Sequence, residues 1–284
     1  MTEGESAPAA ATEPASRNLL MRVVAALVLA PLAIAIVYAG GLLWIAAVTA
    51  VVIGIYLEWL SVVGVARTTR VVAPGITALA VAGFCLMAGR IDAALAVLAI
   101  GLVVSALMAP DRRNWVASGF LYAAAAEVAS VMVRLDADAA KGFAALMLVL
   151  LIVWVTDIGG YFAGRGIGGP KLWPRVSPKK TWAGAIGGFG ASLAVAAGFA
   201  AFGLGKTGPL LLLAAVLSVV SQLGDLFESA VKRRFGVKDS GQIIPGHGGL
   251  LDRLDGFVAA VVLAAIFGFL RGGADGVGRG LMVW

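Results

Sequence analysis

Apolar residues run in long, nearly uninterrupted stretches along most of the chain, and short polar segments separate them. Nine stretches of roughly 20 residues are each long enough to cross the hydrocarbon core of a bilayer as an α-helix. Continuous runs of Ala, Val and Leu favour helices over the alternating strands of a membrane barrel. The sequence therefore predicts an all-α, polytopic membrane protein with about nine transmembrane helices. The expected spans are residues 19–39, 42–64, 71–89, 92–109, 115–134, 142–164, 182–204, 208–231 and 253–271.

Composition supports this class. Hydrophobic residues make up 61% of the 284 positions and charged residues 13%, about half the share usual in soluble domains. The single cysteine, Cys85, lies inside an apolar run, so an intrachain disulfide and a thiol-based metal cluster are both excluded. The net charge of +6 is expected to reflect membrane topology and contact with anionic lipid headgroups, and nucleic acid is not an expected partner.

The basic residues orient the chain. With the N-terminus in the cytoplasm, 16 of the 22 Lys and Arg residues fall on the cytoplasmic side and 6 outside. This asymmetry follows the positive-inside rule and predicts an outer C-terminus. We expect four parts: a disordered polar tail over residues 1–18, N-terminal membrane helices over 19–140, a C-terminal catalytic region over 141–271, and a C-terminal tail over 272–284. The N-terminal tail lacks the basic start of a signal peptide, so the first span is expected to be retained.

Acidic residues within membrane spans are costly unless they are paired or hydrated, and here most share one depth. With the orientation above, all but Glu127 lie near the cytoplasmic boundary, which predicts a single polar site there. Glu127 is mid-membrane, and both it and Glu58 either bond to neighbouring helices or belong to the site. The acids in question are Glu58, Glu127, Asp157, Asp225, Glu228, Asp252 and Asp255.

Helical spacing groups these carboxylates further. Asp225 and Glu228 are three residues apart on one helix face, as are Asp252 and Asp255. Oxygen ligands grouped in this way suit a hard divalent ion such as Mg²⁺, which usually shares its ligands with a substrate phosphate. A simpler interpretation also stands: the second pair are acids in the first turn of a helix, and the first pair form an ion pair with Lys232 or Arg233.

Two polar connections contain most of the remaining chemistry. Residues 165–181 combine glycines and five cations with Ser177 and Thr181, and Thr181 is placed to cap the next helix. Residues 232–253 hold five more cations and the exposed backbone of Gly246, Gly248 and Gly249. Cations beside a helix N-terminus favour phosphate binding, although both loops also suit topology alone. No P-loop pattern is present.

Residues 229–255 resemble the signature of the phosphatidate cytidylyltransferase (CDP-diglyceride synthase) family. The match runs through Ser229, Lys232-Arg233 and Lys238-Asp239-Ser240-Gly241, and ends in the stretch Pro245-Gly246-His247-Gly248-Gly249-Leu250-Leu251-Asp252-Arg253-Leu254-Asp255. A second block, Asp157–Arg165 with Ser177–Gly184, is also similar to that family. The first 140 residues match only as hydrophobic spans.

The resemblance implies a Mg²⁺-dependent transfer of CMP from CTP to phosphatidic acid, giving CDP-diacylglycerol and pyrophosphate. It also implies a nine-span homodimer in a bacterial-type inner membrane, with a polar cavity open to the cytoplasm, and it allows K⁺ beside Mg²⁺. The family's metal-binding aspartates fall on Asp225 and Asp252, and Asp157 and Asp255 match other acidic positions.

We assign the remaining candidates by charge, because two anions must be brought together and a leaving pyrophosphate stabilised. The lipid phosphate is largely a dianion at pH 7 and needs no general base, so His247 is expected to orient its loop or donate to a phosphate. Lys179, Lys180, Lys232, Lys238 and Arg253 are expected to hold phosphates, with Ser177, Thr181, Gly248 and Gly249 as neutral donors.

Three other classes compete with this interpretation. A CDP-alcohol phosphotransferase would show a DGxxAR…GxxxDxxxD pattern, which the sequence lacks. A polyprenol or phytol kinase-type enzyme would use CTP but transfer a different group. A transporter would place its acids at the membrane midplane, where only Glu127 lies.

Overall fold

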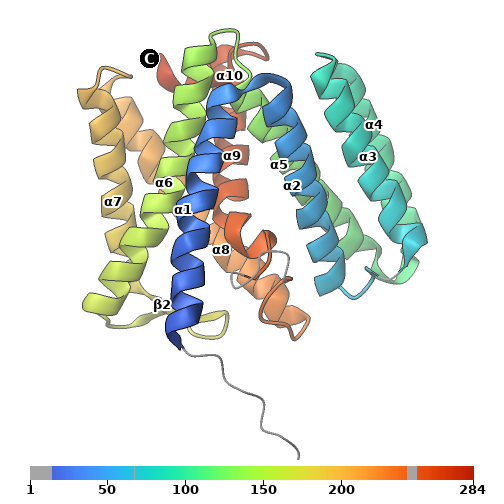
Figure 1. The fold of residues 1–284 in the computed structure, drawn as a ribbon, viewed down its shortest axis with the longest axis horizontal. Helices are drawn as coiled ribbons and strands as arrows, with labels where there is room; N and C mark the ends of the chain where they lie inside the picture. The colour runs from blue at the N-terminus through green and yellow to red at the C-terminus, as the bar shows by residue number, and fades with distance from the viewer. Residues whose placement is uncertain (1–14, 67, 242–247) are drawn as a thin grey trace, which may run out of the picture.

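The computed structural model describes residues 15–66, 68–241 and 248–284, with side chains from residue 27 onward. Apart from one small hairpin, the described chain is helical (Figure 1). The helices are α1 (Ala15–Ala39), α2 (Gly41–Val62), α3 (Thr69–Met87), α4 (Ile91–Leu107), η1 (Pro110–Arg112), α5 (Arg113–Arg134), α6 (Ala139–Gly166), α7 (Trp182–Ala201), α8 (Thr207–Arg234), α9 (Leu251–Gly272) and α10 (Val277–Met282).

The all-α polytopic class is confirmed, and each expected apolar run coincides with one of the helices from α1 to α9. Seven helices in the described part of the chain are long and apolar enough to cross a membrane: α2, α3, α5 (together with η1), α6, α7, α8 and α9. Helix α4 is shorter, with 17 residues, and the part of α1 that is described with side chains is the apolar stretch Leu27–Ala39. Nine membrane spans therefore stay a prediction.

Two elements were not expected. The connection between α6 and α7 contains a hairpin of β1 (Lys171–Trp173) and β2 (Ser177–Thr181), whose strands pair antiparallel with Lys171 opposite Thr181. The stretch 272–284, expected to be a tail, contains α10, in which Val277 and Leu281 are fully buried. At the other terminus α1 already begins at Ala15, inside the stretch 1–18 that was expected to be disordered.

The helices run up and down the bundle, so that alternate connections meet at the same end. The start of α1, the hairpin and the start of α9 lie at one end, whereas α10 and the C-terminus lie at the other (Figure 1). This alternation brings the two polar connections, between α6 and α7 and between α8 and α9, to the same end of the molecule. The location of that end on the cytoplasmic side stays a prediction.

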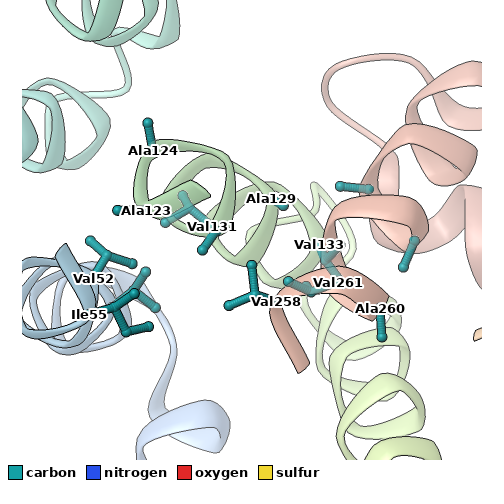
Figure 2. Packing of buried hydrophobic residues seen from close by; sticks show 14 of the residues in the cluster. Val52, Ile55, Ala123, Ala124, Ala129, Val131, Val133, Val258, Ala260 and Val261 are labelled. Atoms are coloured by element: carbon teal, nitrogen blue, oxygen red, sulfur yellow. The ribbon is translucent and has the colours of Figure 1, made fainter. Parts of the chain in front are cut away.

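Helix α5 lies between α2 and α9 in the core, where small and branched side chains interdigitate (Figure 2). Val52 and Ile55 of α2 face α5, and Val258 and Val261 of α9 approach it from the other side. Helices α2 and α5 come close at positions that are occupied by glycine. A Cβ at Gly119 of α5 would lie only 2.1 Å from Cδ1 of Trp59 on α2.

Helices α6 and α7 pack against each other with similarly close backbones. A Cβ at Gly188 of α7 would lie 2.3 Å from the carbonyl oxygen of Thr156, and one at Gly184 would lie 2.7 Å from that of Gly160. Small residues at helix interfaces permit such approach within membranes. The hairpin that joins these two helices is therefore held at a fixed place beside the bundle.

Substitution of Gly119 by alanine tests the packing of α5 on α2. The added methyl group overlaps the Trp59 indole, which also donates a 2.8 Å hydrogen bond from Nε1 to the Trp115 carbonyl oxygen. We expect Gly119→Ala to lower the free energy of unfolding by about 1–3 kcal/mol, measured as a lower thermal unfolding midpoint in detergent. Gly190→Ala on α7 is the matched control, because a Cβ there meets no atom of the described chain within 4 Å. An unchanged midpoint for Gly119→Ala would contradict this packing.

Candidate active site

A cavity of about 550 Å³ lies between α6, α7, α8, the start of α9 and the β1–β2 hairpin. Asp157 of α6, Asp225 of α8, and Asp252 and Asp255 of α9 all line it. The structure thus brings together the four aspartates that the sequence placed at one depth. Lys179 and Lys180 from the hairpin and Arg253 from α9 line the same cavity and add positive charge.

Lys180 connects the hairpin to α8. Its ammonium group donates a hydrogen bond to Oδ2 of Asp225, and both side chains are about one quarter exposed. The next residue, Thr181, accepts a 3.1 Å hydrogen bond on Oγ1 from the Gly184 amide, so it caps α7 as the sequence predicted. The cap and the ion pair together fix the direction of the hairpin's second strand over the cavity.

Asp252 is held by one ammonium group and two backbone amides. Nζ of Lys232 lies 2.5 Å from Oδ1 of Asp252 and 2.6 Å from Oε2 of Glu228, which is almost fully buried. The Ser240 amide lies 3.0 Å from Oδ2, and the Gly249 amide donates to the same oxygen at 3.0 Å. Lys232 therefore forms ion pairs with two carboxylates, and it does not line the cavity.

Asp157 and Asp255 complete a concentration of negative charge. Asp255 interacts electrostatically with Asp225, Glu228 and Asp157. Asp157 interacts with the negative charge of Asp225 and with the positive charges of Lys180 and Arg253. Oδ1 of Asp255 accepts a 2.7 Å hydrogen bond from the Gly256 amide. Carboxylates that repel one another in this way favour a bound cation between them.

The donor set fits a hard cation that shares its ligands with a substrate. Within residues 15–66, 68–241 and 248–284, no group of three or more His, Cys, Asp and Glu side chains is close enough to hold a metal ion alone. Mg²⁺ commonly takes only one or two protein carboxylates and completes its shell with phosphate oxygens and water. The oxygens at the cavity wall agree with that mode of binding.

Comparison with known proteins assigns the chain to a family. Residues 20–270 match the cytidylyltransferase family. The chain belongs to that family. A protein of Brucella suis biovar 1 (strain 1330) named phosphatidate cytidylyltransferase is 40% identical over 261 residues, which cover 88% of this chain and 93% of the relative.

Two further relatives carry the same name. The protein of Brucella melitensis biotype 1 is 41% identical over 261 residues, with the same coverage of both chains. That of Staphylococcus haemolyticus (strain JCSC1435) is 42% identical over 163 residues, which cover 56% of this chain and 62% of the relative. Membership in the cytidylyltransferase family agrees with the resemblance found in residues 229–255.

Some predicted residues lie away from the cavity. Ser177 begins β2 and Lys238 is exposed on the connection after α8; neither lines the cavity. Gly248 has a positive φ of 84° and lies behind Asp252, where a Cβ would come within 3.1 Å of Oδ2. The Gly249 amide donates a hydrogen bond to the Asp252 carboxylate. His247 falls outside the described residues.

The structure also adds side chains that the sequence reasoning missed. Gln222 lines the cavity one helical turn before Asp225, and its Nε2 lies 3.4 Å from the Ala185 carbonyl oxygen on α7. Tyr161 and Arg165 form part of the wall, and Nη1 of Arg165 donates a 2.7 Å hydrogen bond to the Tyr161 hydroxyl. Gln222 was detectable, because its spacing of three residues places it on the same face of α8 as Asp225.

A second hollow, of about 510 Å³, lies between α4, α5 and α9. Apolar side chains such as Leu98, Phe120 and Ile266 form its whole lining, so it offers no group that binds a nucleotide or a phosphate. The cavity with the four aspartates is therefore the candidate active site.

Removal of the buried ammonium group should destabilise the site. Lys232→Met leaves Glu228 and Asp252, which are 1% and 12% exposed, without their shared counter-charge. We expect a loss of stability on the order of 3 kcal/mol, seen as a fall in the thermal unfolding midpoint in detergent. Arg234→Met is the control, because Arg234 is an exposed cation at the end of the same helix. Equal midpoints for the two variants would disprove the paired arrangement.

Proposed function

We propose that this protein is a phosphatidate cytidylyltransferase of phospholipid biosynthesis, which transfers CMP from CTP to phosphatidic acid and releases CDP-diacylglycerol and pyrophosphate. The observation that carries the proposal is the cavity of four aspartates and three cations at one end of the membrane helices. Membership in the cytidylyltransferase family and the name shared by relatives along most of the chain support the choice of substrates.

The reaction requires that the negative charges of the phosphates be stabilised, and it does not require proton transfer. A phosphate oxygen of phosphatidic acid attacks the α-phosphorus of CTP in line, the bond to the bridging oxygen breaks, and pyrophosphate leaves with the electron pair. The attacking phosphate is largely a dianion at neutral pH, so it needs no general base. Lys179, Lys180 and Arg253 line the cavity and are suited to hold the phosphates of the two substrates.

We propose Mg²⁺ as the cofactor, with Asp225 and Asp252 as its protein ligands and Asp157 and Asp255 close by. K⁺ is a second ion that the same carboxylates suit. Bound Mg²⁺ supplies positive charge that offsets the developing charge on the phosphates. In the structure Lys180 and Lys232 already neutralise these two aspartates. These ion pairs hold the two carboxylates in place at the cavity.

The proposed setting follows from topology. We infer a multi-pass protein of a bacterial-type inner membrane, with a cytoplasmic N-terminus and the cavity facing the cytoplasm, where CTP is found. The basic hairpin and the connection after α8 flank the cavity, as the positive-inside rule requires of the cytoplasmic side. A homodimer, with membrane lipids around it, completes the proposal.

The direct test is pyrophosphate release by the purified protein in detergent micelles. We expect release only when CTP, phosphatidic acid and Mg²⁺ are all present, with CDP-diacylglycerol appearing in equal amount. Omission of either phosphatidic acid or Mg²⁺ should reduce the rate to background. Formation of CDP together with a phosphorylated lipid would instead identify a CTP-dependent kinase, and release of CMP from a CDP-lipid would identify a phosphotransferase.

Two neutralising substitutions test the ligand assignment. Asp225→Asn and Asp252→Asn should each lower kcat by about 100-fold or more, because each removes charge from the centre of the cavity. Each should also weaken the shift in thermal midpoint that Mg²⁺ with CTP produces in the wild-type protein. Asp111→Asn, at an exposed position in η1 outside the cavity, serves as the control. Normal turnover of either cavity variant, at normal expression, would remove that residue from the proposed metal site.

A further inference from the structure

Glu58 is a buried carboxylate that the proposed reaction does not use. It lies near the end of α2, in the N-terminal half of the protein, and is only 3% exposed. An ionisable group at such a place is costly unless other groups satisfy it. Its partners are therefore informative about its role.

Three hydrogen bonds connect Glu58 to the segment that leads into α9. Oε1 accepts from the Leu250 amide at 3.0 Å, and Oε2 accepts from the Leu251 amide at 2.8 Å. Oε2 also accepts from the Ser240 hydroxyl at 2.9 Å. The donors lie more than 180 positions further along the chain, so α2 binds the signature segment directly.

These contacts replace a local helix cap. The first amides of a helix have no partner within the helix, and a side-chain oxygen usually accepts from them. Leu250, at the N-cap position of α9, offers no such oxygen. Glu58 supplies it from α2, and its negative charge also lies at the positive end of the α9 dipole.

The face of α2 around Glu58 is shaped for this segment. Gly54 lies one turn before Glu58 on the same face, and a Cβ there would be 2.6 Å from Cδ1 of Leu250. On the other side, a Cβ at Gly249 would be 2.4 Å from Oε2 of Glu58, and one at Gly241 would be 2.6 Å from Oε1. Glycines at these three positions therefore allow the carboxylate to reach the backbone.

The donors to Asp252 adjoin the donors to Glu58 along the chain. The amides of Ser240 and Gly249 donate to the Asp252 carboxylate. The Ser240 hydroxyl also donates to Glu58, and Gly249 directly precedes Leu250, whose amide donates to Glu58. Ser240 bonds to Asp252 through its amide and to Glu58 through its hydroxyl. A shift of this segment away from α2 would move two of the donors that orient Asp252.

We propose that Glu58 is a positioning residue: it caps α9 and fixes Ser240 and residues 249–252, so that Asp252 is held in the geometry needed at the cavity. The inference about activity rests on the proposed function. The inference about order in the segment does not, and it can be measured separately.

The test compares Glu58→Gln with Glu127→Gln by amide hydrogen exchange and by steady-state kinetics. Glu127 is an equally long, buried glutamate, but its Oε1 accepts from the Thr49 hydroxyl at 2.7 Å in a different part of the bundle. Glutamine keeps the size of Glu58 but replaces one acceptor oxygen with a donor. We expect amides in residues 248–256 to exchange roughly tenfold faster in Glu58→Gln and to be unchanged in Glu127→Gln.

The kinetic part should show a split between kcat and KM. We expect Glu58→Gln to lower kcat roughly tenfold while KM for phosphatidic acid changes little, because Glu58 does not line the cavity. Ser240→Ala removes only one of the three hydrogen bonds and should show a smaller change of the same kind. It keeps the test decisive if Glu58→Gln does not fold.

Each outcome is decisive. Unchanged exchange at residues 248–256 would overturn the proposal, as would faster exchange spread equally over the whole chain, which indicates general destabilisation. Faster local exchange with normal kcat would show that the segment's order does not matter for the reaction, and would overturn the positioning role. If the wild-type protein releases no pyrophosphate, the proposed function fails, and the exchange experiment alone decides whether Glu58 orders the segment.

Discussion

A charge inside a membrane bundle is tolerated only where an opposite charge or a hydrogen-bond donor meets it, and this constraint shapes the end of the molecule that holds the polar cavity. Lys232 lies between Glu228 and Asp252, and Lys180 reaches from the hairpin to Asp225. These pairs connect α8 to α9 and to the connection between α6 and α7. Two of the four aspartates that line the polar cavity, Asp225 and Asp252, are thus met by a cation from a neighbouring element.

The close packing of small residues makes that arrangement possible. Gly119 admits the Trp59 ring between α2 and α5, and the glycines of α6 and α7 allow their backbones to approach within the radius of a methyl group. Such interfaces leave little freedom for helices to slide. The ion pairs at the end of the bundle therefore form between side chains whose backbones are already placed, which reduces the entropy lost on pairing.

Much of this could be predicted from the sequence, because membranes impose strong rules on length and charge. Runs of about 20 apolar residues predicted the helices to within a few residues, and the depth of Asp157, Asp225, Asp252 and Asp255 predicted that they share a site. The individual partners could not be predicted. Lys180, Lys232 and their neighbours were all assigned to phosphates, since a sequence shows that cations are near but not which carboxylate each one meets. The β1–β2 hairpin was missed because its strands are short and lie among glycines and prolines.

Glu58 shows the same limit more sharply, because its partners are two backbone amides and a serine hydroxyl that have no sequence pattern connecting them to α2. One consequence is that the two halves of the chain are not independent units. A division of the chain near residue 140 into a membrane anchor and a catalytic unit would separate the cap of α9 from the helix that it caps. A fragment made only of the C-terminal half, or a chimera that joins it to an unrelated set of helices, would retain the four cavity aspartates but lose the contact that orders the first turn beside them. The structure around the cavity therefore depends on helices from both halves of the chain.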